Sequence, residues 1–232
     1  MDRFSCTHFE LSPSLICMDL CRLEEEVRRL EQVGVKVLHV DVLDGHFSPS
    51  MPIGLDTIRQ LRKKTQLIFD AHVMATNNEF FVHELMDIGC ERICFHLETQ
   101  RAPEPLLHEI RLAGCEAGLA LSPGTPLTDV EYLLEECDRM LLMRISPGYA
   151  HLPGQEVKPY MSRKLQELHS MIASRGLSTQ ICVDGHIGFD DVRPLVEAGA
   201  STLVCGTRCL IRKDSTLEEN WAKLHQLLVP EQ

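Results

Sequence analysis

The stretch Leu38-His39-Val40-Asp41-Val42-Leu43-Asp44-Gly45-His46-Phe47 is a short apolar run that carries a histidine and a carboxylate two residues apart. In a β-strand, side chains at positions i and i+2 point to the same face, so we expect His39 and Asp41 to project together into one cavity. Burying an imidazole and a carboxylate is costly unless the two are paired, hydrogen-bonded or bound to a metal. The stretch therefore predicts either a core histidine satisfied by its neighbouring acid or a functional site.

Apolar runs of this kind recur along the chain and alternate with amphipathic segments of helical period. We expect strands over residues 9–16, 35–43, 67–74, 91–97, 116–121, 139–145, 178–184 and 201–205. We expect helices over residues 19–33, 55–64, 78–88, 104–113, 127–136, 160–174, 189–198 and 217–228. Eight pairs of strand and helix in 232 residues predict a closed (β/α)8 TIM barrel, an α/β fold that forms one domain over residues 1–232.

Three residues mark expected helix ends. Asp19 is the expected N-cap of the first helix, and Gly34 and Gly89 are expected to end the first and third helices. An open, doubly wound sheet is the competing architecture for alternating strands and helices. Its dinucleotide fingerprint, Gly-x-Gly-x-x-Gly at the start of the first helix, is absent after the first expected strand. The barrel is therefore the preferred interpretation.

Composition argues against several classes of partner. The formal net charge of −11 argues against a nucleic-acid partner, because such binding draws most of its affinity from clustered Lys and Arg. No apolar run reaches the roughly 18 residues needed to span a bilayer, so we expect no membrane partner. The N-terminus lacks a long apolar signal core, so we interpret the ten cysteines as free thiols in a reducing, cytoplasmic compartment.

In a barrel of this kind the active site lies at the carboxyl ends of the strands. The second expected strand places His39 and Asp41 there, the third places His72 and the seventh places Asp184. Each of these four alone is typical of a satisfied core polar group, but four that converge on one mouth favour a divalent-metal site with nitrogen and oxygen ligands. Such a ligand set accepts Zn, Fe, Mn or Co. The other notable side chains at these strand ends are Ser14, Met74, His96 and Met143.

Asp41 and Asp184 belong to strands on different sides of the expected barrel mouth, so they could face opposite sides of a flat substrate. A carbon acid beside a ketone would lose its proton to one carboxylate and leave a planar enediolate, whose negative oxygens a divalent cation can hold. The other carboxyl group would return a proton from the opposite face and invert the stereocentre. This chemistry needs one ionised base and one protonated acid near neutral pH.

Glycine-containing loops follow the last three expected strands. They are Pro147-Gly148-Tyr149-Ala150-His151-Leu152-Pro153-Gly154-Gln155, Asp184-Gly185-His186 and Gly206-Thr207-Arg208. Glycines let backbone N–H groups approach a phosphate, and the loops after strands seven and eight are the habitual phosphate position in this fold. A single glycine is more often a plain turn, but the three loops together predict a phosphorylated substrate.

Taken together, these segments resemble the ribulose-phosphate 3-epimerase family along nearly the whole chain. The matching pieces are Ser12-Pro13-Ser14-Leu15, His39-Val40-Asp41-Val42-Leu43-Asp44-Gly45, Ala71-His72-Val73-Met74, Met143 with Pro147-Gly148, Val183-Asp184-Gly185 and Gly206-Thr207. The resemblance implies a ribulose-phosphate-binding barrel that inverts carbon 3 of a ketose phosphate through an enediolate. It also implies one divalent metal ion held by His39, Asp41, His72 and Asp184, with Asp41 and Asp184 as the acid/base pair.

The same resemblance implies substrate contacts from Ser14, His72, Met74, Met143, Gly148, Gly154, Gly185, His186, Gly206 and Thr207. In this set the two methionines form an apolar wall around the enediolate, and the glycines and Thr207 form the phosphate loops. The sequence departs from the family pattern at Leu43, where a methionine is usual, and at His186, which replaces a glycine. The sixth loop is longer by residues 151–153. His186 and Arg208 are interpreted as cationic contacts to the phosphate, as residues that narrow the pocket, or as plain surface residues.

The substrate stays open between two pairs of sugar phosphates. The family resemblance implies D-ribulose 5-phosphate and D-xylulose 5-phosphate, whereas the segment 12–20 and Gly206-Thr207 are more similar to the allulose-6-phosphate 3-epimerase branch, which implies D-allulose 6-phosphate and D-fructose 6-phosphate. Two rival functions keep the same fold. One is a metal-free phosphate-binding isomerase or decarboxylase, and the other is a non-catalytic barrel that binds a sugar phosphate. A homo-oligomer is expected from the family resemblance alone.

Overall fold

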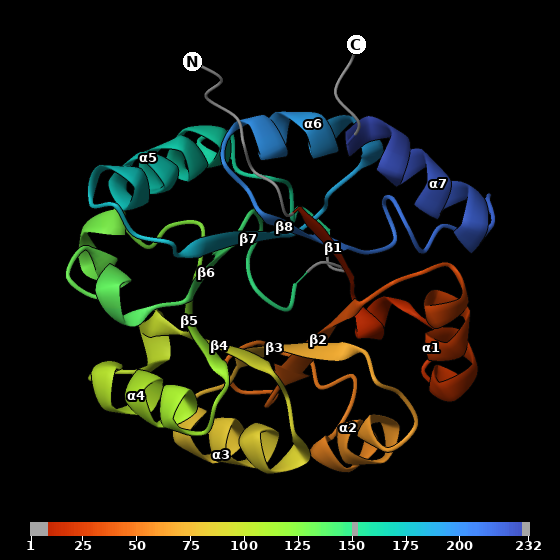
Figure 1. Ribbon diagram of the computed structural model, residues 1–232, viewed down its shortest axis with the longest axis horizontal. Helices are drawn as coiled ribbons and strands as arrows, with labels where there is room; N and C mark the ends of the chain where they lie inside the picture. The colour runs from red at the N-terminus through yellow and green to blue at the C-terminus, as the bar shows by residue number, and fades with distance from the viewer. Residues whose placement is uncertain (1–8, 150–152, 229–232) are drawn as a thin grey trace.

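Short apolar segments form a ring of parallel strands, and the amphipathic segments between them form helices around its outside (Figure 1). The computed structural model describes residues 9–149 and 153–228. Its strands are β1 (Glu10–Pro13), β2 (Val37–Leu43), β3 (Ile68–Met74), β4 (Arg92–His96), β5 (Glu116–Leu121), β6 (Arg139–Met143), β7 (Gln180–Asp184) and β8 (Thr202–Cys205). The predicted TIM barrel is confirmed.

The helices follow the strands in the order of the chain. The α-helices are α1 (Leu23–Gln32), α2 (Leu55–Arg62), α3 (Asn78–Ile88), α4 (Glu104–Leu112), α5 (Met161–Ser174), α6 (Phe189–Glu197) and α7 (Leu217–Leu228). Four short 3-10 helices are η1 (Leu15–Cys17), η2 (Leu97–Thr99), η3 (Leu127–Val130) and η4 (Leu134–Glu136). None of the helices in residues 9–149 and 153–228 is long and apolar enough to cross a membrane.

All neighbouring strands pair in parallel, in the order β1-β8-β7-β6-β5-β4-β3-β2. The two ends of this order meet between β1 and β2, where the described chain has a single bridge, from Ser14 to His39. The side chains alternate along each strand. On β2, Val40 and Val42 pack toward the helices in the large core, which leaves His39 and Asp41 to point into the barrel. The predicted common orientation of His39 and Asp41 is confirmed.

Two predicted helix features are wrong. The segment 127–136 is not one α-helix but the two turns η3 and η4, because side chains distant in sequence take its carbonyl groups: Arg175 donates to the Glu131 oxygen and Thr179 to the Leu134 oxygen. Asp19 is not an N-cap. Its carboxylate accepts a hydrogen bond from the Cys21 amide at 3.0 Å, a local turn that delays the start of α1 to Leu23.

The predicted glycine stops are confirmed. Gly34 follows α1 with φ of 95°, and Gly89 caps α3 with φ of 89°, both in the left-handed region that favours glycine. The first strand ends at Pro13, three residues earlier than predicted, because residues 15–17 turn into η1 with the Cys17 amide donating to the Ser14 carbonyl. The turn carries Ser14 to the carboxyl end of the barrel.

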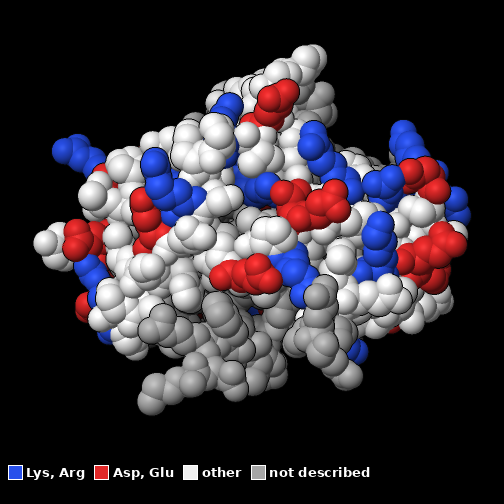
Figure 2. Space-filling model, turned by 90° about the horizontal axis from the view of Figure 1, so that it is seen from above, with Lys and Arg blue, Asp and Glu red and all other residues white. Residues whose placement is uncertain are grey.

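On the face seen in Figure 2, Lys and Arg side chains are interspersed with Asp and Glu side chains. Exposed ion pairs in the described chain include Arg28 with Glu24 and Arg163 with Glu167. Exposed pairs of this kind contribute little to stability, on the order of 0 to 1 kcal/mol each. A face of mixed charge does not provide the continuous basic surface that binds a nucleic-acid backbone.

Candidate active site and metal centre

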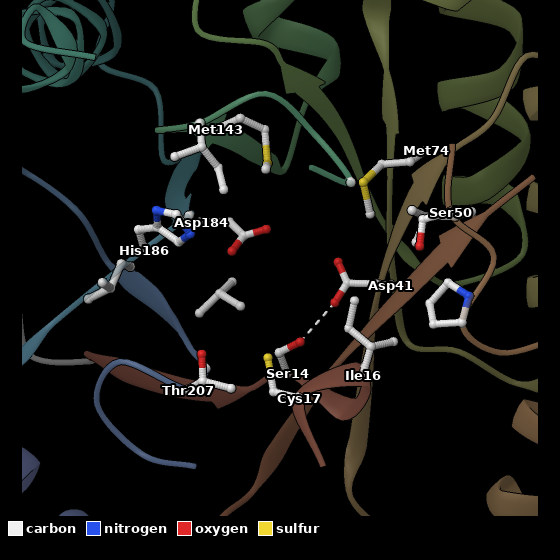
Figure 3. A pocket seen from close by; sticks show the side chains of 18 of the residues that line it. Ser14, Ile16, Cys17, Asp41, Ser50, Met74, Met143, Asp184, His186 and Thr207 are labelled. Atoms are coloured by element: carbon white, nitrogen blue, oxygen red, sulfur yellow. Dashed lines mark hydrogen bonds between the residues drawn. The ribbon is translucent and has the colours of Figure 1, made fainter. Parts of the chain in front are cut away.

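A pocket of about 340 Å³ opens at the carboxyl ends of the strands. Figure 3 shows Asp41, from β2, and Asp184, from β7, pointing toward each other from opposite sides of this pocket. Met74 and Met143 lie together on one side of the two carboxyl groups, and Ser14 lies on the other side. Ser14 after β1 and side chains of β2, β3, β6 and β7 therefore meet at one mouth, as the census of strand ends predicted, whereas His96 of β4 does not line the pocket.

Two buried imidazoles meet the two carboxyl groups below the pocket. The Oδ1 atom of Asp41 lies 3.4 Å from His39 Nε2 and 3.3 Å from His72 Nδ1. The Oδ2 atom of Asp184 lies 4.0 Å and 3.8 Å from the same two nitrogens. One ligand atom from each of the four residues lies within 4.8 Å of the other three.

This cluster fits a divalent cation. His39 and His72 are completely buried, and neither His39 Nε2 nor His72 Nδ1 has a hydrogen-bond partner among the described residues. Buried nitrogens without partners are costly, and both of these face the same point between the two carboxyl groups. A cation bound by two imidazoles and two carboxylates would satisfy them, and this mixture of nitrogen and oxygen ligands suits Zn, Fe, Mn or Co.

The surroundings shift the pKa values of the two carboxyl groups in opposite directions. Burial alone would raise the pKa of Asp41, but the imidazoles of His39 and His72 beside it outweigh burial and hold that pKa well below its usual value. Burial and the neighbouring Asp41 carboxylate raise the pKa of Asp184. Ser14 Oγ also donates to Asp41 Oδ2 at 2.9 Å. The cluster thus contains one carboxylate and one carboxyl group that binds a proton more readily.

The loops after β6, β7 and β8 line the remaining wall of the pocket through Gly148, Gly185, His186, Gly206 and Thr207. Gly185 has φ of 110° and His186 has φ of 53°, the one non-glycine residue with positive φ in the described chain. Successive backbone N–H groups in a tight turn can form a concavity that suits an anion. The sequence-predicted phosphate loops are therefore brought together at this mouth.

Gly148 has no room for a side chain. A Cβ atom on it would lie 2.1 Å from Ser48 Oγ and 2.9 Å from Leu43 Cδ2, so the loop after β6 packs closely on the loop after β2. The structure places Gly154, another predicted phosphate contact, on the exposed surface and outside the residues that line the pocket. His151 and Leu152, in the predicted insertion, lie outside the described residues.

Several residues that line the pocket escaped the sequence reasoning. Ile16 and Cys17 follow Ser14 on η1, and Ser50 and Pro52 come from the loop after β2. The short spacing from Ser14 could have indicated the first two. The pKa of the Cys17 thiol is raised to about 11, mainly by burial, so it lines the pocket as an uncharged group. Nothing in the sequence of the loop singles out Ser50 or Pro52.

Comparison with known families identifies the family of this chain. Residues 10–210 match the family described as the ribulose-phosphate 3 epimerase family. The chain belongs to the ribulose-phosphate 3-epimerase family. The predicted family resemblance is thus confirmed, and membership makes the chain an enzyme of the carbohydrate-epimerase class.

Members of the family are similar to this chain over most of its length. The ribulose-phosphate 3-epimerase of Methanocaldococcus jannaschii is 34% identical over 205 residues, which cover 88% of this chain and 86% of that protein. The ribulose-phosphate 3-epimerase of Synechocystis is 37% identical over 202 residues, 85% of each chain. The chloroplastic ribulose-5-phosphate-3-epimerase of Arabidopsis thaliana is 34% identical over 216 residues, 92% of this chain and 76% of that protein.

Solved structures extend the likeness of this epimerase to more distant barrels. The 3-keto-L-gulonate-6-phosphate decarboxylase of Vibrio cholerae has a TM-score of 0.69 at 12% identity and covers 95% of this chain and 97% of its own. The orotidine 5'-phosphate decarboxylase of Pyrococcus horikoshii has a TM-score of 0.64 at 14% identity, with 94% and 98% covered. At these identities the likeness is one of fold.

Proposed function

We propose that this epimerase inverts carbon 3 of a ketose phosphate by proton transfer between two carboxyl groups. The observation that carries the proposal is the placement of Asp41 and Asp184 on opposite sides of one pocket (Figure 3), with two imidazoles beside them. One carboxylate would take the proton from carbon 3 and leave a planar enediolate. The other carboxyl group would return a proton to the opposite face, which inverts the configuration at that carbon.

The other residues of the pocket have supporting roles in this proposal. A divalent cation held by His39, Asp41, His72 and Asp184 would offset the negative charge on the enediolate oxygens. The hydrogen bond from Ser14 Oγ fixes the orientation of the Asp41 carboxylate. Met74 and Met143 present apolar side chains beside the carboxyl groups, which excludes water from the planar intermediate. The backbone N–H groups of the loops that contain Gly185, Gly206 and Thr207 would hold the phosphate.

Two pairs of substrates are consistent with this pocket. The names of the family relatives support D-ribulose 5-phosphate and D-xylulose 5-phosphate. The sequence segment 12–20 and Gly206-Thr207 support D-allulose 6-phosphate and D-fructose 6-phosphate. The departures Leu43 and His186 line the pocket, as does Arg208, so we infer that these three residues contribute to the choice between a pentulose and a hexulose.

Hydrogen exchange in deuterated water tests the proposed reaction directly. The protein is incubated with each of the four sugar phosphates, and deuterium at carbon 3 is followed by proton nuclear magnetic resonance. We expect deuterium to enter both epimers of one pair, because each direction of the reaction removes the original proton from carbon 3. The pair with the larger kcat/KM identifies the substrate.

Two results would contradict the proposal. A sugar phosphate that binds without exchange at carbon 3 would indicate a non-catalytic binding barrel. Migration of the carbonyl group without exchange at carbon 3 would indicate a phosphate-binding isomerase of different mechanism. Loss of carbon dioxide from a β-keto-acid sugar phosphate, added as a fifth compound, would indicate a decarboxylase. The parent sugars without phosphate are the matched control, since they keep the reacting carbon and lack the group that the loops would hold.

The metal content of the purified protein forms a second prediction. We expect about one divalent ion per chain when the protein is purified without chelator, because four ligand atoms converge on one point. Prolonged chelation should abolish exchange at carbon 3, and addition of Zn²⁺, Fe²⁺, Mn²⁺ or Co²⁺ should restore it to different degrees. A metal-free protein that retains full activity would contradict the metal site and support the metal-free isomerase.

The cellular compartment, the partner and the oligomeric state of the enzyme are also proposals. We infer a reducing, cytoplasmic compartment, which is supported by free thiols at all of the described cysteines. We infer a small-molecule sugar phosphate as the partner, and a homo-oligomer from the family likeness. Sedimentation of the purified protein measures the oligomeric state.

A further inference from the structure

The two ring nitrogens of His72 have different surroundings. Its Nδ1 atom faces the cluster, 3.3 Å from Asp41 Oδ1, whereas its Nε2 atom faces away and lies 3.0 Å from Nε2 of His96. His96 is completely buried at the end of β4, and its ring packs against that of Phe47 with the centroids 4.7 Å apart. His96 does not line the pocket, so nothing in the proposed reaction requires it.

A carboxylate holds the far side of His96. The Nδ1 atom of His96 lies 2.7 Å from Oε2 of Glu98, in η2. The other oxygen of Glu98 accepts hydrogen bonds from the Ser122 amide at 2.6 Å and from the Thr125 hydroxyl. Burial alone would raise the pKa of Glu98, but the hydrogen bond from His96, with those from Thr125 and Ser122, lowers it to about 2. Glu98 is therefore an acceptor on both of its oxygens.

The loop that binds Glu98 is itself fixed. Lys164, on α5, is buried and donates through Nζ to the carbonyl oxygens of Ser122 at 2.9 Å, Pro123 at 3.1 Å and Thr125 at 2.7 Å. An ammonium group that holds three carbonyls leaves the loop little freedom to follow a movement of Glu98. The side chains of His72, His96 and Glu98 form a hydrogen-bonded row, and Lys164 connects the Glu98 end of this row to α5 in the outer layer of the barrel.

The Glu98 carboxylate sets the direction of the hydrogen bonds that join Glu98, His96 and His72. The carboxylate of Glu98 can only accept, so the proton between it and His96 belongs to His96 Nδ1. A neutral His96 then has a lone pair on Nε2, which accepts the proton of His72 Nε2. A neutral His72 with its proton on Nε2 has a lone pair on Nδ1, the atom that faces the cluster. The row therefore prepares His72 Nδ1 to bind a cation.

We propose that Glu98 and His96 are positioning residues, which hold His72 in the tautomer whose Nδ1 lone pair faces the metal site. The proposal rests on the metal site that was proposed above and extends it to two residues outside the pocket. Partners of this kind behind a ligating histidine change metal affinity by about 10- to 100-fold in other proteins.

The substitution Glu98→Gln tests the direction of the row. The amide keeps the size of the side chain, but its single oxygen is drawn toward the two donors of Ser122 and Thr125. Its NH2 group would then face His96 Nδ1, reverse the tautomer of His96, and thereby place the proton of His72 on Nδ1. We expect the dissociation constant of Co²⁺, measured by absorption titration of metal-free protein, to rise by about 10- to 100-fold.

The chain offers a matched control for this change. His83 Nε2 lies 2.7 Å from Glu109 Oε2 on the outer surface, where the two side chains are 53% and 51% exposed. Glu109→Gln makes the same change in the same kind of pair, far from the cluster, and should leave the Co²⁺ affinity within about twofold. Thermal unfolding of the metal-free variants checks that the fold is intact.

A second variant and a second measurement keep the proposal testable if Glu98→Gln folds poorly. His96→Phe keeps a ring against Phe47 and removes the acceptor for His72 Nε2, so it should also weaken Co²⁺ binding.

Nitrogen-15 spectra of the metal-free protein, at a pH where imidazole is neutral, should report the His72 proton on Nε2 in the unchanged chain and on Nδ1 in Glu98→Gln. Unchanged Co²⁺ affinity in both variants, or a His72 tautomer that does not respond, overturns the proposal. A chain that binds no Co²⁺ before substitution overturns the metal site as well, whereas exchange at carbon 3 reports independently on the reaction.

Discussion

Replacing Asp184 with asparagine should reduce the rate of epimerisation by at least about 10³-fold, because the substitution removes both an acid/base group and a metal ligand. Asp41→Asn should have an effect of similar size for the same reasons. An amide can neither take a proton from carbon 3 nor provide one, and its neutral oxygen binds a divalent cation less well than a carboxylate does. The measurement is kcat for conversion of one epimer into the other.

The two variants should differ in which epimer they still recognise. If each carboxyl group serves one face of the substrate, Asp184→Asn retains proton removal by Asp41 from one epimer only, and Asp41→Asn retains it from the other. Slow deuterium exchange without inversion should then appear with opposite epimers in the two variants. Exchange from the same epimer in both would mean that one group serves both faces, and near-normal turnover in either would remove that residue from the mechanism. Metal content must be measured for each variant, so that loss of the ion is separated from loss of the base.

Replacing Arg139 with methionine should lower the free energy of unfolding by about 3 to 5 kcal/mol, the usual cost of removing one partner from a buried ion pair. Arg139 is completely buried inside the barrel, with Nη2 at 3.7 Å from the buried carboxylate of Asp70. It also donates to Gln180 at 2.6 Å and to Thr202 at 3.0 Å. Burial alone would raise the pKa of Asp70, but the charge of Arg139 outweighs burial and lowers it to about 2. Without Arg139, Asp70 would be a buried carboxylate that has lost its nearest cation.

Urea unfolding near neutral pH measures this effect. The double variant Asp70→Asn/Arg139→Met removes both charges, so it should recover a substantial part of the stability that Arg139→Met loses. Arg139→Lys keeps the charge without the planar group and should fall between the two. A loss below about 1 kcal/mol in Arg139→Met would mean that water or another group compensates Asp70, contrary to the buried pair described. The measurement is made on metal-free protein, because Asp70 Oδ2 also lies 3.7 Å from His39 Nδ1 and a bound cation would add to the stability that is measured.

The sequence predicted the elements whose signals are local. The helix α3 has the predicted limits because Asn77 accepts from the Phe80 amide at its start and Gly89 adopts positive φ at its end. The pair of His39 and Asp41 was predictable because strand alternation is a local rule. The segment 127–136 was not, because Arg175 and Thr179 reach its carbonyls from more than forty positions away. Long-range hydrogen bonds of this kind leave no periodic pattern in the segment that receives them.

The residues of the site divide in the same way, into those with a local sequence signal and those whose role depends on long-range contacts. The four proposed metal ligands could be selected by residue type and position at strand ends, and the structure brings them together. The role of His96 and Glu98 behind His72 could not be predicted, although His96 was among the notable strand-end residues. That role depends on the register of β3 beside β4 and on the loop after β5. Arg139 had one available signal. It begins β6, and charged residues also begin β1, β4 and β5, a pattern that indicates an ionic layer at the amino end of the barrel.

The join between β1 and β2 gives the opening stretch a mechanical role. A single backbone bridge, from Ser14 to His39, closes the ring there, and a side-chain bond from Ser14 to Asp41 lies beside it. Both β2 residues belong to the cluster that fits the cation, and Asp184 reaches the cluster from β7, the third strand on the other side of the join. A cation bound by these residues would link the two sides of the join between β1 and β2. It would also stabilise the folded state by mass action, as does any ligand that binds only that state. Binding of the ion would then stabilise the fold as well as enable the reaction. The metal-free enzyme would therefore be both less stable and inactive.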